Sequence, residues 1–125
     1  MKFHTIHSLE DAYYQKAVEF YNKQLDVDFF EDSIITKRSL QNNKTENDYV
    51  LIVGIEKENI ISLATAHYEA TTNSAFLVHL LAVVDSNYDE IISQTLNEVE
   101  THLNILSNKV HARDINFLMI EVPKL

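Results

Sequence analysis

Apolar positions follow a helical period in the first third of the chain. Residues 2 to 7 come first and alternate in polarity, as expected of a short strand. From Ser8 the apolar residues recur every three or four positions, and Asp11 stands where a capping box places its acid. The pattern therefore predicts a helix from Ser8, a second helix over roughly residues 28 to 41, and a polar loop over residues 41 to 48.

From residue 49 the apolar residues form nearly continuous runs, which are typical of strands covered on both faces. Short polar turns separate three such runs, and this arrangement predicts an antiparallel meander. The three predicted strands cover residues 49–55, 60–70 and 75–84.

A long helix and a last strand are predicted after the meander. Ser86 and Asp89 have the spacing of a capping box, and the helical period continues to Asn108 or Lys109. An apolar run over residues 115–122 predicts a strand, and a strand-helix-strand unit implies a right-handed crossover with parallel strands. The predicted order is β-α-α-β-β-β-α-β, an α/β mixed sheet with helices on both faces, in a single domain over residues 1–125.

Composition narrows the classes of function. The chain has 19 acidic and 10 basic residues, for a net charge of −9. This balance disfavours nucleic acid and anionic membranes as partners. With no cysteine there is no thiol chemistry, and with one glycine and one proline a glycine-rich loop is excluded. No apolar run approaches the ~18–20 residues of a membrane helix, and the N-terminus has no apolar signal core, so a cytoplasmic location is expected.

The order and spacing of these segments resemble the GNAT superfamily of N-acetyltransferases over nearly the whole chain. KFHTIHSLED resembles the first strand and the start of the first helix, and YVLIVGIEKENIISLATAHYE resembles the second and third strands. AFLVHLLAVVDSNY resembles the fourth strand, SQTLNEVETHL the third helix and INFLMIEV the fifth strand. The resemblance implies transfer of an acyl group, usually acetyl, from coenzyme A to an amine. The cofactor would lie between the fourth and fifth strands.

The phosphate-binding loop of that family has no counterpart here. The family pattern, Arg/Gln-x-x-Gly-x-Gly/Ala, exposes backbone amides to the cofactor's pyrophosphate at a helix N-terminus. In this chain Asp85, Asp89 and Glu90 occupy the same junction, with no glycine and no basic residue. Side chains would block close approach of an anion, while the acids would repel it and stabilise the helix end. The junction therefore predicts a self-capped helix.

The strand position that holds a glutamate base in many family members corresponds to Leu77, which cannot take a proton. His79 lies two residues on, is expected on the same strand face, and is the candidate base. With the turn centred near residues 72 and 73, His67 is expected opposite His79. Two histidines suit a metal, but no third ligand has supporting spacing, so no metal site is predicted. The simpler interpretation of both is a polar residue on a sheet face.

The family continues beyond its fifth strand with a helix and two strands, and this chain stops three residues after Val122. The fold is therefore expected to be truncated after the fifth strand. The resemblance also implies loss of the tyrosine that protonates the leaving thiolate. An apolar edge strand associates unless it is covered, so we expect a homodimer, or a second domain or protein, over residues 115–122.

Three functions remain open from the sequence. The first is a degenerate GNAT-like domain that acts as a binding or assembly module and uses no cofactor. The second is a divergent N-acyltransferase that uses acetyl-CoA, with His79 as the base. The third is an unrelated α/β ligand-binding or regulatory domain. Under the second, the positions beside the cofactor would be Val83, Val84, Asp85 and Tyr88.

Overall fold

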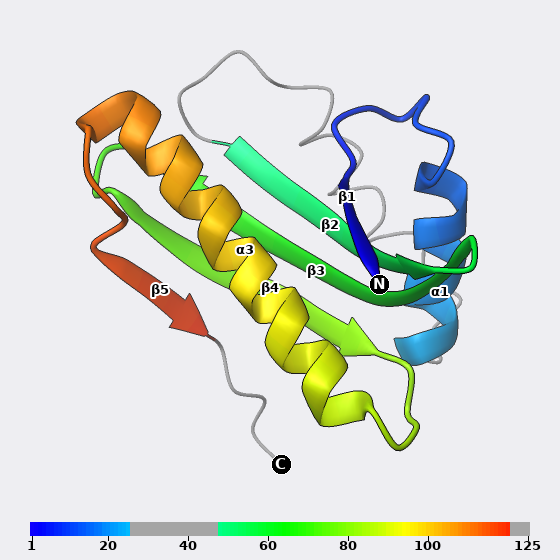
Figure 1. Cartoon of the computed structure of the whole chain (residues 1–125). Helices are drawn as coiled ribbons and strands as arrows, with labels where there is room; N and C mark the ends of the chain where they lie inside the picture. The colour runs from blue at the N-terminus through cyan, green and yellow to red at the C-terminus, as the bar shows by residue number, and fades with distance from the viewer. Residues whose placement is uncertain (26–47, 121–125) are drawn as a thin grey trace.

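The computed structural model describes residues 1–25 and 48–120 and shows a five-stranded sheet (Figure 1). The strands lie side by side in chain order, so the predicted meander is confirmed, and the last strand runs parallel to the fourth as predicted. The strands are β1 Lys2–Thr5, β2 Asp48–Glu56, β3 Asn59–Glu69, β4 Ser74–Ala82 and β5 Phe117–Ile120.

Two helices cover opposite faces of the sheet (Figure 1). They are α1 Tyr14–Leu25 and α3 Tyr88–His111. Successive residues of β2 alternate between the two layers: Val50 packs with the α3 residues Val99 and Leu103, and Leu51 packs with Ala17 of α1. A strand buried on both faces needs apolar side chains at every position, which explains the continuous apolar run from residue 49.

The first helix begins later than its sequence pattern predicts. The Ser8 hydroxyl accepts a hydrogen bond from the Glu10 amide at 3.0 Å, and the Asp11 carboxylate accepts one from the Tyr13 amide at 2.8 Å. Short polar side chains that bond to nearby amides hold the backbone in turns instead of helix. The predicted start at Ser8 is therefore wrong. Asp11 begins the turn directly ahead of α1 and is not the acid of a capping box.

The long helix also differs at both ends. Ser86 is not its cap: Asn87 occupies the N-cap position and makes no side-chain capping bond. At the other end the helix continues past the predicted stop to His111, and Ala112 closes it in a left-handed conformation with φ of 56°. The Ala112 amide donates to the Asn108 carbonyl at 3.1 Å, a bond typical of helix C-termini.

The predicted second helix, roughly residues 28 to 41, and the polar loop at 41–48 fall outside the described residues. Within the described ranges the order is β-α-β-β-β-α-β. No helix in those ranges is long and apolar enough to cross a membrane.

The chain's one glycine serves packing. Gly54 lies within β2, and a Cβ atom there would collide with the Ser62 side chain of β3. The Ser62 hydroxyl lies 2.8 Å from that of Thr95 on α3, and both residues are fully buried. Absence of a side chain at Gly54 thus leaves room for a polar contact between sheet and helix.

Candidate functional site

The junction between β4 and α3 holds the residues that were assigned to a cofactor by position. The Val83 amide donates to the Ile61 carbonyl of β3 at 2.9 Å, so it is already used within the sheet. Val84 is 87% exposed, and Tyr88, the first residue of α3, is 38% exposed. The structure therefore brings these positions together at one end of the sheet, as the sequence implied, with one of their amides engaged.

Asp85 accepts two hydrogen bonds from the start of the helix. Its carboxylate accepts from the Asn87 amide at 2.7 Å, and its backbone carbonyl accepts from the Tyr88 amide at 3.2 Å. Exposed amides at a helix N-terminus attract anions because the helix dipole is positive there. In this structure the first of those amides is bonded to a carboxylate of the chain itself.

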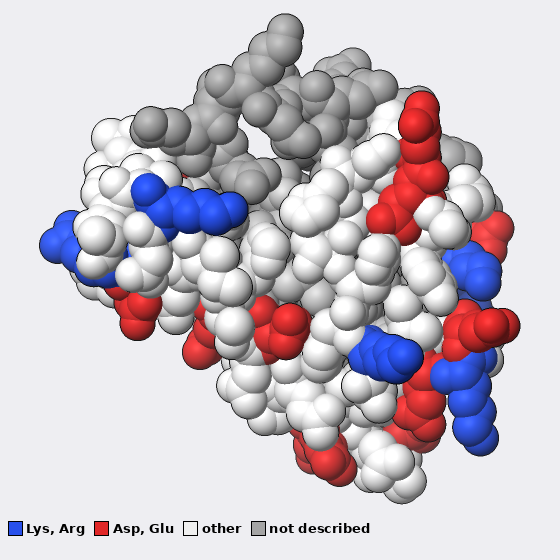
Figure 2. All heavy atoms as spheres, turned by 45° about the horizontal axis from the view of Figure 1, so that its top comes forward, with Lys and Arg blue, Asp and Glu red and all other residues white. Residues whose placement is uncertain are grey.

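Further acids surround this helix end. Asp89 and Glu90 lie in the first turn of α3. The surrounding sequence has no compensating bases: residues 58–108 contain no lysine or arginine. Their seven acids are Glu58, Glu69, Asp85, Asp89, Glu90, Glu98 and Glu100. On the face drawn in Figure 2, basic side chains stand singly and form no continuous patch. This half of the domain is therefore electrostatically unfavourable for an anion.

His79 lies in a polar cluster on the α1 face of the sheet. Its Nδ1 atom is 2.7 Å from the Thr65 hydroxyl, and its Nε2 atom is 3.1 Å from the Tyr21 hydroxyl. The Tyr21 ring meets the imidazole edge-on, with centroids 4.9 Å apart. Tyr21 and Thr65 are buried. Because a neutral imidazole donates through one nitrogen and accepts through the other, two hydroxyl partners hold the ring in place.

A β-bulge sets this position. Thr65 of β3 pairs with His79 and Ala66 pairs with Leu77, so Val78 is an extra residue in β4. The strand alternation changes by one at that point: Leu77 packs in the α3 core, while His79 faces α1. The prediction that Leu77 and His79 share a face is therefore wrong.

His67 does not face His79. It pairs with Phe76 in the register of β3 and β4, and its imidazole lies 3.7 Å from the Glu69 carboxylate and edge-on to Tyr49. The expected cross-strand pair of histidines is wrong, because the turn sets a register in which Glu69 pairs with Ser74 and His67 with Phe76, three residues short of His79. Among the described residues, no group of three or more His, Cys, Asp or Glu side chains is placed to hold a metal ion.

Sequence reasoning assigned neither Tyr21 nor Thr65 to His79 as a partner. Tyr21 belongs to the apolar stripe of the first helix, and nothing in its spacing distinguishes it from a packing residue. Thr65 comes opposite His79 only because of the bulge, which has no sequence signature here. A pattern that fixes the register of β3 against β4 would have found the cluster.

A second polar cluster lies at the start of the chain. The His4 imidazole is 2.7 Å from the Asp11 carboxylate. Burial raises the pKa of Asp11, but hydrogen bonds from the Tyr13 amide and His4 and the charges of His4 and His7 outweigh it, so the pKa is lowered overall. These contacts fasten the turn ahead of α1 to β1, so we regard the cluster as structural.

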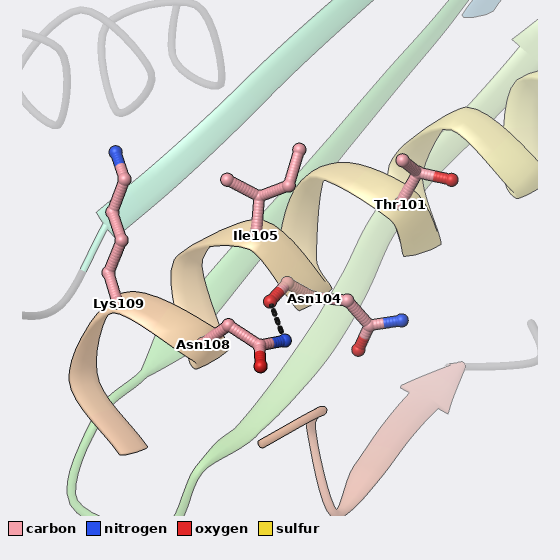
Figure 3. A pocket seen from close by; sticks show the side chains of 5 residues that line it. All are labelled: Thr101, Asn104, Ile105, Asn108 and Lys109. Carbon is pink, nitrogen blue, oxygen red and sulfur yellow. Dashed lines mark hydrogen bonds between the residues drawn. The ribbon is translucent and has the colours of Figure 1, made fainter. Parts of the chain in front are cut away.

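A shallow hollow on the outer face of α3 is lined by Thr101, Asn104, Ile105, Asn108 and Lys109 (Figure 3). The side-chain amide of Asn108 donates to the backbone carbonyl of Asn104 at 2.7 Å, and the Thr101 hydroxyl donates to the backbone carbonyl of Asn97 at 2.9 Å. Asn108 also donates to the Asp114 carboxylate at 2.8 Å, and Asn104 accepts from the Ile115 amide at 3.1 Å. These polar groups are used within the helix and the segment after it and do not converge on a common point, so the hollow lacks the arrangement of a ligand site.

Solved acetyltransferases share this fold. A probable acetyltransferase superposes with a TM-score of 0.70 at 9% identity, over 98% of this chain and 80% of that one. Aminoglycoside 6'-acetyltransferase type Ii superposes with a TM-score of 0.67 at 8% identity, over 85% of this chain and 66% of that one. Ribosomal-protein-alanine N-acetyltransferase from Brucella melitensis biovar Abortus 2308 superposes with a TM-score of 0.58 at 15% identity, over 99% of this chain and 81% of that one.

The sequence itself matches no protein-family model and no curated protein. The chain spans 66% of the length of the type Ii enzyme and 56% of an aminoglycoside 6'-N-acetyltransferase from Enterococcus faecium. The superpositions, at these low sequence identities, establish a GNAT-like acetyltransferase fold, as the sequence predicted.

Proposed function

We propose that this GNAT-fold domain acts as a binding or assembly module and does not work as an efficient acetyl-CoA enzyme. The observation that carries the proposal is the bonding of Asp85. Its carboxylate lies 2.7 Å from the Asn87 amide, at the helix end where a pyrophosphate would need free donors. A ligand anion would have to displace a charged acceptor that the chain supplies itself.

Charge at the same place supports the proposal. Asp85, Asp89 and Glu90 precede or occupy the first turn of α3. Each acid favours the bare helix end by roughly 0.3–1 kcal/mol where it is well placed, and the same field repels a phosphate. We therefore propose that the domain binds neither acetyl-CoA nor coenzyme A as a cofactor.

A partner over the last strand is part of the same proposal. Phe117 is 65% exposed, Met119 42% and Ile120 52%. Phe117 and Met119 line an apolar hollow together with Phe76 of β4. Exposed apolar side chains on an edge strand favour association. We propose a homodimer, or a second domain or protein, as the cover.

Calorimetric titration with coenzyme A tests the central part of the proposal. We expect no heat of binding at millimolar ligand for the natural chain. The matched variant carries Asp89→Asn and Glu90→Gln, which remove charge and keep side-chain size. Micromolar binding by the natural chain would overturn the proposal. Binding by the variant alone would show that charge is what excludes the cofactor.

The second candidate function is a divergent N-acyltransferase that transfers acetyl from acetyl-CoA to an amine. The contacts of His79 with Tyr21 and Thr65 favour it, because a positioned imidazole is a competent general base near neutral pH. Two of the similar structures are aminoglycoside acetyltransferases, so a cationic amine is the acceptor class to try first.

An acetylation assay with an aminoglycoside as acceptor separates the two candidates. The enzyme interpretation requires turnover that His79→Ala abolishes and His67→Ala leaves intact, since His67 lies outside the cluster. We expect no turnover above the uncatalysed rate in any of the three proteins. Turnover that depends on His79 would replace the proposed function by this one.

A further inference from the structure

An apolar hollow of about 450 Å³ lies on the sheet face opposite α3, where β4 and β5 begin. Leu77 and Leu118 pack in the α3 core, so the residues beside them in β4 and β5 point to the other face. We call this site the β4–β5 hollow. Its lining residues are Glu69, Thr72, Ser74, Phe76, Phe117 and Met119.

The β4–β5 hollow lies beyond the part of this face that α1 covers. His79 contacts Tyr21 of α1. One row further along the face, Phe76 pairs with His67 of β3 and with Met119 of β5. Phe76 is 39% exposed and Met119 is 42% exposed, and α1 lies far from β5 (Figure 1). Within the described residues, ring and thioether surface is therefore open to a partner.

Glu69 is the one charged residue in the lining of the hollow. Its side chain is 43% exposed, and its carboxylate lies 3.7 Å from the His67 imidazole, which is longer than a hydrogen bond. The hydroxyls of Thr72 and Ser74 lie 2.6 Å apart and bond to each other. The hollow therefore offers a visiting group one carboxylate beside aromatic rings.

A carboxylate beside aromatic rings suits the side chain of arginine. The guanidinium group is planar, stacks on ring faces and keeps its positive charge at physiological pH. It bonds carboxylates well, and it is more weakly hydrated than the ammonium of lysine. Residues 58–108 contain no lysine or arginine, so the strands around Glu69 supply no cation of their own.

We propose that the β4–β5 hollow receives an arginine side chain of a partner protein, which stacks on the exposed rings of Phe76 and Phe117 and pairs with Glu69. The inference rests on the proposed function, because it names the chemistry that would hold a partner over the last strand. Arginine is among the residues that contribute most to binding at protein interfaces.

Charge favours a different protein over a second copy of the chain as the occupant. Two copies related by a two-fold axis present the same surface to each other, so each would bring Glu69 into the contact. None of the six lining residues is basic, and each copy carries a net charge of −9. Like charges placed together oppose association, whereas opposite charges increase the rate and specificity of binding.

The test uses the full chain, labelled for amide NMR, and two capped alanine tripeptides. One has arginine at its centre, and the other has citrulline, an uncharged analogue of the same shape. We expect the arginine tripeptide to shift the amide signals of Glu69, Phe76 and Phe117. It should bind about fivefold to tenfold more tightly than the citrulline tripeptide, which lacks the charge for the ring contact and the ion pair.

Two pairs of variants separate the ion pair from the ring contact. Glu69→Gln removes the charge and keeps the size, and Glu100→Gln, at an exposed position of α3, is its matched control. We expect Glu69→Gln to bind the arginine tripeptide about threefold more weakly than the control does. Phe117→Leu should also bind it about threefold more weakly than Phe117→Tyr, which keeps an aromatic ring.

Several results would overturn the inference. They are equal binding of the two tripeptides, signal changes away from the β4–β5 hollow, or equal affinities within either pair of variants. A doubled molar mass with no signal change in the hollow would show instead that a second copy occupies it.

Failure of the proposed function looks different from failure of this inference. Coenzyme A would then bind and shift the signals of residues 85–90, which lie beyond the other end of β4. If neither coenzyme A nor the arginine tripeptide binds, only the present inference fails.

Discussion

Asp11 shows how a single side chain fixes the start of the first helix. Its carboxylate accepts the Tyr13 amide and contacts His4 of β1, and these contacts lower its pKa. A carboxyl whose pKa is lower in the folded state than in the unfolded state stabilises the fold, and this stability is fully present at pH values above the unfolded-state pKa. That stability is lost as the pH falls through the folded-state pKa.

Asp11→Asn is expected to lower the free energy of unfolding at neutral pH by about 0.5–1 kcal/mol. The amide of asparagine can still accept from Tyr13, but it has no charge for His4. In urea unfolding at a series of pH values, the gap between variant and natural chain should close as the pH becomes strongly acidic. A gap that persists below the folded-state pKa would contradict the assignment.

Asn73 connects three elements through one buried side chain. Its Oδ1 atom accepts from the hydroxyls of Tyr68, at 2.8 Å, and Ser107, at 2.6 Å. Its Nδ2 group donates to the Asp114 carbonyl at 3.0 Å, and its own carbonyl accepts from the Asn116 amide at 2.8 Å. Its φ of 48° also suits asparagine better than most residues.

Asn73→Ala should destabilise the protein by about 2–4 kcal/mol, because it leaves several buried polar groups without partners. Asn108→Ala is the matched control, since that asparagine is exposed and bonds near the end of its own helix. In denaturant unfolding, the control should lose less than about 1 kcal/mol of unfolding free energy. Similar losses in the two variants would mean that Asn73 does not connect the elements as described.

At the scale of elements, Asp85 holds the turn that precedes α3. Asp85→Ala should cost about 1 kcal/mol in unfolding free energy, since the Asn87 amide loses its acceptor. Ser86→Ala should change stability by less than about 0.5 kcal/mol, because Asn87, not Ser86, occupies the N-cap position. Thermal unfolding of the two variants tests whether Asp85 or Ser86 stabilises the start of α3. A larger loss of stability for Ser86→Ala would favour the capping box of Ser86 and Asp89 instead.

The sequence predicted the elements better than the register between them. Continuous apolar runs identified β2, β3 and β4, because strands buried on both faces have few alternatives. The bulge at Val78 could not be predicted, since an extra residue in an apolar run leaves the run apolar. The candidate site depends on that residue: it turns His79 toward Tyr21 and Thr65 and away from Leu77.

The predicted starts of both helices were wrong for a related reason. Ser8 and Asp11, like Ser86 and Asp89, have the spacing of a capping box, but spacing cannot say which amide each side chain reaches. In both cases an aspartate accepts an amide two residues on and holds a turn ahead of the helix. A local competition between turn and helix therefore decided the boundary.

At the scale of the whole molecule, the chain has the fold of solved acetyltransferases, and at the start of α3 the Asn87 amide is bonded to the carboxylate of Asp85. Similarity in fold does not carry an activity with it, because function depends on the site. The exposed apolar surface of β5 and β4 is the other feature that a solitary domain would not favour.

The apolar surface leads to a prediction about association. If a homodimer covers Phe117 and Met119, light scattering should give twice the chain mass of 14.5 kDa. Phe117→Lys should then shift the protein to monomer, since lysine loses its hydration at an apolar contact. Val84→Lys, at an exposed position beyond the other end of β4, is the control. A strict monomer at high concentration would contradict the homodimer and leave a separate partner as the cover.

The most direct test of the central claim is a calorimetric titration of the natural chain with acetyl-CoA. The account predicts no heat of binding up to millimolar ligand, because Asp85 bonds the Asn87 and Tyr88 amides at the start of α3 and the charges of Asp89 and Glu90 repel a pyrophosphate. Binding at micromolar concentration would contradict it, and would show that the acids at this junction leave the cofactor site of the fold intact.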